Sequence, residues 1–233
     1  MKFQIVALLP MRHNSERVPG KNYRMFAGQP LFHCILQSLL KCDYVKEIVI
    51  DTDSSPIIED VTKKFPQVTL LERPNYLRGT TVPMNDIIAW DISQTEADFY
   101  IQTHSTNPLL RSETIKGSID FFLKHHPRCD SLFSVTRLQT RLWDQKIRAI
   151  NHDPKVLLRT QDLSPIYEEN SNLYIFTKDS FEKNKNRIGN KPIMFEIDRR
   201  EAIDIDEELD FQFAELLYKN CYLREIGSNI WKN

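Results

Sequence analysis

The chain has 233 residues, enough for an α/β domain with a sizeable buried core. Lysine and arginine together number 31 and aspartate and glutamate 32, so the net charge is -1. This balance disfavours nucleic acid or a membrane surface as the main partner, and no apolar stretch has the length of a membrane span. We therefore expect a cytoplasmic protein that binds a small molecule. Its scattered cysteines are expected to be reduced thiols: Cys34, Cys42, Cys129 and Cys221.

The first half of the chain alternates short apolar runs with amphipathic segments. Strands are predicted at 5–9, 47–53, 68–71, 99–102 and 130–136, and helices at 30–42, 56–65, 84–92 and 112–125. Strand and helix units that alternate with short connections indicate an α/β fold with a doubly wound, mainly parallel sheet. In such a sheet, ligands bind beyond the carboxyl ends of the strands.

The pattern changes after Thr136. Short strands are predicted at 141–150, 156–159 and 172–176, and helices follow at 178–184 and 207–218. We interpret residues 137–176 as a β-rich arm inside one domain that spans 1–233. No internal repeat, low-complexity tract or proline-rich linker marks a second domain.

The loop that follows the first strand collects positive charge. Arg12, Arg17 and Lys21 lie here with few acidic neighbours, and cations with free backbone amides at a strand end suit an anion such as phosphate. Neither G-x-x-x-x-G-K-[ST] nor G-x-G-x-x-G occurs, which disfavours a Walker-type ATPase and a dinucleotide-binding protein. The alternative is that these are solvated surface cations, and their place at the mouth of the first strand weakens it.

Two aspartates near the C-terminus form a second candidate site. In an extended Asp204-Ile205-Asp206 segment both carboxylates share one face, and such a pair can hold a magnesium ion that also binds a nucleoside triphosphate. The alternative is that Asp206 caps the helix that follows. Asp51 and Asp53 form another pair, for which ordinary turn chemistry is the stronger interpretation.

Polar residues also follow the fourth predicted strand. The run from Gln102 to Asn107 offers amide and hydroxyl groups that can bind a sugar or a base. His104 has no visible Asp or Ser partner, so we expect it to form hydrogen bonds and not to act as a base.

The loop carries a family signature. Arg12, Ser15, Arg17, Pro19, Gly20, Lys21 and Asn22 resemble the signature of the CMP-acylneuraminate synthetases, the cytidylyltransferases that activate sialic acids and related keto-sugar acids. Further blocks resemble the family in the same order over nearly the whole chain: Thr52-Asp53-Ser54, Arg73-Pro74, Gln102 with Thr106-Asn107-Pro108-Leu109, Arg159-Thr160-Gln161, Asn170 before Leu173-Tyr174-Ile175, and Asp204-Ile205-Asp206 with Asp210-Phe211.

This resemblance implies a Rossmann-like nucleotidyltransferase with a small dimerisation arm. The enzyme would join CMP from CTP to a keto-sugar acid and release pyrophosphate, with Mg²⁺ as cofactor and a homodimer as the assembly. The implied catalytic residues are Arg12, Lys21 and Asp206, and the implied metal ligands are Asp204 and Asp206. The implied nucleotide-binding residues are Arg12, Ser15, Arg17, Lys21, Asn22 and Arg73, and the implied acceptor-binding residues are Gln102, Arg159, Gln161 and Asn170.

The chain departs from the family pattern at two places. His13 and Asn14 stand where the family commonly has Gly-Gly, and Glu16 stands at a basic position. The usual Pro-Thr-Ser-Pro block is replaced by residues 104–108. The acceptor therefore stays open among sialic, legionaminic, pseudaminic and octulosonic acids, and other carboxylates or phosphonates. A same-fold enzyme that uses another nucleotide and a non-catalytic nucleotide-sugar-binding protein are the alternatives.

Overall fold

A computed structural model describes residues 3–222, except for the side chains of residues 221 and 222. Cys34, Cys42 and Cys129 are free and buried, as expected, whereas the expectation for Cys221 lies outside the described side chains. No helix among the described residues is long and apolar enough to cross a membrane.

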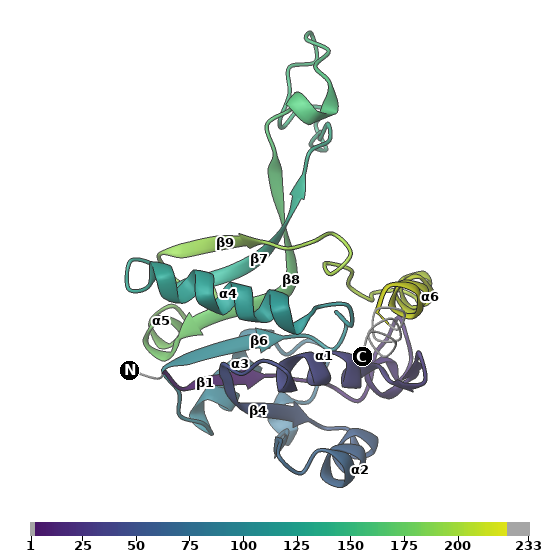
Figure 1. The fold of residues 1–233 in the computed structure, drawn as a ribbon, viewed down its shortest axis with the longest axis vertical. Coiled ribbons are helices and arrows are strands. Elements are labelled where there is room, and N and C mark those ends of the chain that lie inside the picture. Colours follow the sequence, from purple (N-terminus) through teal and green to yellow (C-terminus); the bar gives the residue numbers. More distant parts are fainter. Residues whose placement is uncertain (1–2, 223–233) are drawn as a thin grey trace, which may run out of the picture.

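A seven-stranded sheet organises the fold (Figure 1). Its spatial order is β5-β4-β1-β6-β8-β7-β9, and only β8 runs antiparallel to its neighbours in this sheet. The expected mainly parallel α/β sheet is therefore confirmed. The strands are β1 (Ile5–Leu8), β4 (Val45–Thr52), β5 (Thr69–Glu72), β6 (Phe99–Thr103), β7 (Ser131–Leu138), β8 (Ile166–Thr177) and β9 (Pro192–Glu196), and a separate hairpin pairs β2 (Met25–Phe26) with β3 (Gln29–Pro30).

Helices cover both faces of the sheet. The helices are α1 (Leu31–Leu40), α2 (Ser55–Lys64), α3 (Met84–Ser93), α4 (Ser112–His125), α5 (Lys178–Asn184) and α6 (Glu208–Leu217). One apolar cluster joins α1, α2 and α4 to the sheet, and a second joins α3 and α5 to the opposite face. The chain is thus doubly wound, as the alternation of strands and helices predicts.

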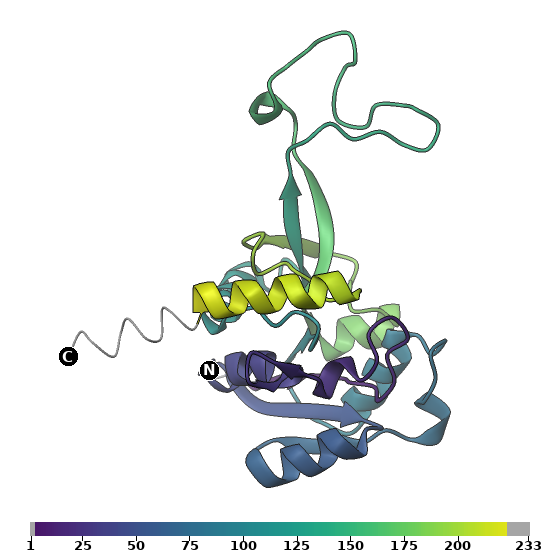
Figure 2. The ribbon, with the colours of Figure 1, turned by 90° about the vertical axis from the view of Figure 1, so that its right-hand side faces the viewer.

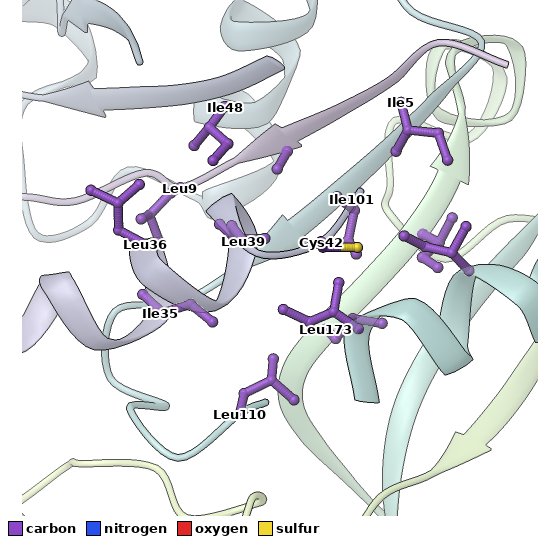
Figure 3. Close-up of a cluster of buried hydrophobic side chains, with 14 of the residues drawn as sticks. Ile5, Leu9, Ile35, Leu36, Leu39, Cys42, Ile48, Ile101, Leu110 and Leu173 are labelled. Atoms are coloured by element: carbon purple, nitrogen blue, oxygen red, sulfur yellow. The ribbon is translucent and has the colours of Figure 1, made fainter. Parts of the chain in front are cut away.

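The central strand β1 is buried on both faces. Ile5 and Ala7 belong to the cluster shared with α1 and α4, whereas Val6 and Leu8 belong to the cluster shared with α3. Figure 3 shows part of the first cluster, in which side chains from β1, β4, β6 and α1 meet. Because successive side chains of a strand point to opposite faces, a short continuous apolar run is the pattern of such a strand.

Strands β7 and β8 continue out of the sheet into an arm, residues 139–165, that projects away from the rest of the chain (Figures 1 and 2). The short strands predicted at 141–150 and 156–159 are wrong: one isolated bridge joins Trp143 to Ala149, and a single 3₁₀ turn covers Thr160–Asp162. Local side-chain contacts replace a β ladder here. The Asp144 carboxylate, for example, accepts hydrogen bonds from the backbone amides of Lys146 and Arg148.

Two further boundaries differ from the sequence prediction. Strand β8 begins at Ile166 and not at residue 172, because its first half pairs with the end of β7 at the base of the arm. Strand β9 was missed. Its sequence, Pro192 to Glu196, begins with proline, which weakens a strand prediction but is tolerated at the first residue of an edge strand.

Candidate active site at the carboxyl ends of the strands

A pocket of about 270 Å³ lies beyond the carboxyl ends of β1 and β6. The loop after β1, the segment that leads into α3, and the loop after β6 form its walls. Its lining residues are Pro10, Met11, Arg12, Lys21, Asn22, Arg73, Gly79, Val82, Met84, Ile87, His104, Ser105 and Thr106. This is the place at which a doubly wound sheet is expected to bind its ligand.

Asn22 fixes the loop that follows β1. Its side-chain amide donates to the Arg12 carbonyl at 2.7 Å, and its carbonyl oxygen accepts from the Ser105 hydroxyl at 2.7 Å. Gly20 has a φ of 64°, a left-handed conformation that glycine adopts without strain. The buried Asn22 thus joins the loops after β1 and β6, and it presents the exposed Arg12 to the pocket.

His13 turns away from the pocket. Its backbone amide donates to Asp53 at 2.6 Å, its Nδ1 lies 2.9 Å from the Ser54 hydroxyl, and its ring stacks on Tyr23 with centroids 5.3 Å apart. Neither His13 nor the exposed Asn14 and Glu16 line the pocket. The departures from the family pattern in this loop therefore leave the pocket open. The backbone amide of this loop gives Asp53 a structural partner.

Lys21 connects the loop to the aspartate pair. It is buried, and its ammonium group donates to the backbone carbonyl of Ile205. Burial lowers the pKa of Lys21, while the charges of Asp204 and Asp206 act in the opposite direction. Asp206 also accepts from Arg17 at 2.6 Å. Arg17 is exposed and, like the half-buried Ser15, does not line the pocket, although both were predicted to bind the nucleotide.

The alternative in which Asp206 caps the helix that follows is wrong. Glu207 caps α6, and Asp210 accepts hydrogen bonds from the backbone amides of Asp206 and Glu207 at 3.0 and 2.8 Å. Because Asp210 and Glu207 satisfy the start of the helix, the Asp206 carboxylate is available to Arg17 and to a ligand. The extended backbone also buries Ile205 beneath the two aspartates, as the alternation predicts.

The aspartate pair fits a hard divalent cation. Burial raises the pKa of Asp204, and its Oδ1 is buried without a hydrogen-bond partner in the part of the chain that the structure describes. No group of three or more His, Cys, Asp or Glu side chains among the described residues could hold a metal. Mg²⁺ is held by one or two carboxylates plus phosphate oxygens and water, so two aspartates beside a pocket lined by cations are an appropriate donor set.

Arg73 enters the pocket from a buried ion pair. Its Nε lies 2.9 and 3.1 Å from the two carboxylate oxygens of Asp51, and neither side chain is more than 4% exposed. One Nε–H is shared between the two oxygens, and Nη2 donates to the backbone carbonyl of Asp51 at 3.4 Å, so contacts to a single residue restrain the guanidinium. Asp51 therefore positions Arg73, which agrees with a structural interpretation of the Asp51–Asp53 pair.

A second buried carboxylate, Asp91 on α3, lies next to Asp51. Both Asp91 oxygens are buried and receive no hydrogen bond from an N–H or hydroxyl group of the described residues. Burial and the charge of Asp51 raise the pKa of Asp91 well above its ordinary value, and burial raises the pKa of Asp51 to about 6. Sequence analysis missed Asp91. The signal was an acidic residue on the apolar stripe that Ile87, Ile88 and Ile92 form.

Gln102 and His104 form a hydrogen-bonded wall. The Gln102 amide nitrogen donates to the Thr103 carbonyl and to His104 Nε2, each at 2.9 Å. His104 Nε2 is therefore the acceptor, and the imidazole is neutral with its proton on Nδ1. Burial and the charges of Arg187 and Lys21 lower the pKa of His104 to about 3. His104 thus has the hydrogen-bonding role that its sequence context predicts.

The predicted acceptor residues do not meet within one chain. Gln102 adjoins the pocket through His104. The amide of Asn170 is used inside the sheet, where it contacts Ser134 at 2.6 Å and Thr136 at 3.0 Å. Arg159 and Gln161 lie on the arm, and Arg159 forms an exposed ion pair with Asp162 at 2.7 Å. These four residues therefore do not form a single site in this arrangement.

Comparison with known proteins identifies the family of this chain. The sequence model of the cytidylyltransferases, described as "Cytidylyltransferase", matches residues 6–226. The chain belongs to the cytidylyltransferase family. It is therefore a nucleotidyltransferase, and the resemblance detected in the sequence motifs is confirmed.

Relatives of this cytidylyltransferase act on different acids. CMP-N,N'-diacetyllegionaminic acid synthase of Legionella pneumophila is 28% identical, over 92% of this chain and 96% of the relative. Pseudaminic acid cytidylyltransferase of Campylobacter jejuni is 25% identical with the same coverage, and N-acylneuraminate cytidylyltransferase of Oncorhynchus mykiss is 25% identical over 92% of this chain and 50% of the relative. The structure of CMP:2-keto-3-deoxy-manno-octonic acid synthetase complexed with CTP shares the fold, with a TM-score of 0.69, 14% identity and coverage of 93% and 98%.

The buried Asp51–Asp91 pair predicts an unusual pH dependence of stability. Because both carboxyl groups bind protons more tightly in the folded state, the free energy of unfolding falls as pH rises from about 4 through the raised pKa values. Asp91→Asn removes one of the two groups whose ionisation destabilises the folded state. Between pH 4.5 and 7.5, the free energy of unfolding measured by urea titration should fall by at least about 1 kcal/mol more in wild type than in Asp91→Asn. Asp86→Asn, an exposed change on the same helix, should behave like wild type, and identical profiles for wild type and Asp91→Asn would contradict the assignment.

Proposed function

We propose that this enzyme transfers CMP from CTP to the anomeric hydroxyl of a keto-sugar acid and releases pyrophosphate. The observation that carries the proposal is the convergence of Arg12, Lys21 and Arg73 on one pocket, with the Asp204–Asp206 pair held against Lys21. Cations and a carboxylate pair are the groups that a nucleoside triphosphate and its metal require. The substrates named for the relatives support a sugar acid as acceptor.

The side chains act mainly by positioning and charge. Arg12 and Lys21 bind the triphosphate and stabilise the charge that develops on the leaving pyrophosphate. Asp204 and Asp206 would hold Mg²⁺, which supplies further positive charge at the phosphates when it is bound. His104 Nε2 already accepts a hydrogen bond from Gln102, so it is not available as a base for the attacking hydroxyl.

Pyrophosphate release tests the proposal directly. Wild type is assayed with CTP, GTP, UTP or ATP against N-acetylneuraminic, N,N'-diacetyllegionaminic, pseudaminic and 2-keto-3-deoxy-manno-octonic acids, with Mg²⁺ or with EDTA. We expect release with CTP, one or more acids and Mg²⁺ only. Asp204→Asn should lose at least about 100-fold in rate, as expected when a metal or transition-state charge contact is removed. Glu208→Gln, an exposed change that faces Arg24, should retain the rate. Release with another nucleotide in place of CTP, or with none of the acids, refutes the proposal.

Lys21→Ala should distinguish a triphosphate contact from a base contact. Removal of the ammonium group should weaken CTP binding about 10-fold or more, the value of a charged hydrogen bond, and should weaken CMP binding much less. Isothermal titration with each nucleotide measures both constants. Lys41→Ala, an exposed change at the end of α1, serves as the control. Equal losses for CTP and CMP would assign Lys21 to another part of the nucleotide.

A homodimer formed through the arm is part of the proposal. The arm exposes large apolar side chains: Trp143, Ile147, Ile150, Val156, Leu157 and Leu158, of which Ile147 and Leu157 are 82% and 89% exposed. Apolar groups concentrated on a projecting segment are typical of an interface. Contact with a second copy would also give Arg159 and Gln161 a neighbouring pocket to reach.

Light scattering after size exclusion measures this assembly. Wild type should have the mass of a dimer, and Ile147→Lys with Leu157→Lys should convert it to monomer, because two charges would be buried in the interface. Met25→Lys, an exposed apolar position outside the arm, should remain dimeric. A monomeric wild type would exclude this assembly.

A further inference from the structure

Arg187 lies over one face of the sheet near the active site. It belongs to the connection between α5 and β9, and its guanidinium sits 4.0 Å above the ring of Tyr174. Its Nη1 donates to the Gln102 carboxamide oxygen at 2.5 Å. Gln102 and Tyr174 are direct neighbours across β6 and β8, so one guanidinium covers a cross-strand pair at the carboxyl end of β6.

The charge of Arg187 is not neutralised by direct contact with a carboxylate in the part of the chain that the structure describes. Among the described residues, no carboxylate forms an ion pair with Arg187, and its buried Nε has no hydrogen-bond partner. The charge of Glu169 acts on Arg187, but the Glu169 carboxylate accepts its hydrogen bond from the Tyr174 hydroxyl at 2.5 Å. A half-buried guanidinium that keeps free donors is unfavourable alone and is stabilised by a ligand that brings negative charge.

A continuous contact path joins Arg187 to the pocket. Gln102 binds Arg187 through its oxygen and His104 through its nitrogen, and His104 lines the pocket together with Lys21. This arrangement fixes the Gln102 amide, since only its oxygen can accept from a guanidinium. Arg187 does not line the pocket itself but lies behind the wall that Gln102 and His104 form, toward β8. The neutral His104 adds no positive charge there, so Arg187 is the cation next to this wall, whereas Arg73 follows β5.

We infer that Arg187 binds an oxyanion of the acceptor and thereby helps to select it. The inference rests on the proposed function, and it adds Arg187 to the acceptor-binding residues that the family resemblance implies, among which Arg159 is the only cation. Gln102 is a positioning residue in this assignment, because its amide orients the guanidinium and is already fully engaged. The oxyanion comes either from the carboxylate at the keto-acid end or from a second anionic substituent on the sugar.

Titration of sugar acids into the CTP-free and CMP-bound enzyme tests the inference. The acids are the four used for pyrophosphate release, and Arg187→Gln should weaken binding of the preferred acid about 10- to 100-fold, as for a lost charged hydrogen bond. CTP affinity should stay unchanged, and Arg187→Lys should recover part of the loss. Arg128→Gln, an exposed change at the amino end of β7 and hence at the opposite edge of the sheet, should leave acid binding unchanged.

Carboxamide derivatives of the same acids identify the oxyanion. If Arg187 binds the keto-acid carboxylate, the carboxamide binds wild type and Arg187→Gln equally weakly. If it binds a second anionic substituent, Arg187→Gln weakens only ligands that carry that group. The inference is overturned if Arg187→Gln weakens the binding of an uncharged carboxamide as much as that of the parent acid. It is also overturned if Arg187→Gln binds every acid as tightly as wild type does.

The result is separable from the proposed reaction. Acid binding that depends on Arg187, without pyrophosphate release from any acid, supports the Arg187 site and refutes cytidylyl transfer. Pyrophosphate release with acid binding that is insensitive to Arg187→Gln supports the reaction and refutes the Arg187 site. A wild type that binds none of the four acids refutes both.

Discussion

The hydrogen bond from Lys21 to the Ile205 carbonyl joins the loop after β1 to the segment before α6. Its partners are 184 positions apart in the sequence, yet the site depends on their contact. The loop after β1 carries Arg12, and the segment before α6 carries Asp204 and Asp206. A buried lysine is stable only when its charge is compensated, and the two aspartates compensate it. The hydrogen bond that holds these two segments together therefore also brings Arg12 and Lys21 close to Asp204 and Asp206.

Sequence patterns predicted the structure correctly where a residue type has one common environment, as apolar residues have in the core. The continuous apolar run at residues 5–9 predicted a strand, which forms as Ile5–Leu8 and is buried on both faces, and the alternation around Ile205 predicted two carboxylates on one side. Amide side chains gave no such certainty. Asn22 and Asn170 carry the same group, but Asn22 lines the pocket whereas Asn170 is used between β7 and β8. Which partner an amide finds depends on tertiary contacts that a single sequence does not reveal.

The errors in the predicted fold have the same origin. The arm contains residues with high strand propensity, but the structure offers them no neighbouring strand, and local turns around Asp144 and Asp153 satisfy the backbone instead. Strand β9 is the opposite case, because a weak sequence beginning at Pro192 becomes a strand through pairing with β7. Strand formation at both places was decided by the partner. Arg187 was missed for a related reason: its contacts are with Gln102 on β6 and Tyr174 on β8, which the sequence alone does not place beside it.

The cations around the pocket differ in how fully the protein neutralises them. Arg73 has a buried carboxylate, Asp51, as a permanent partner, so its guanidinium is fixed before any ligand binds. Lys21 is compensated by Asp204 and Asp206, so in the proposed function its contact with the triphosphate would be coupled to the metal that these aspartates would hold. Arg187 has only an amide and an aromatic face. No carboxylate of the described residues contacts Arg187 directly, so in the proposed function an acceptor that carries its own negative charge would supply the compensation that this guanidinium lacks.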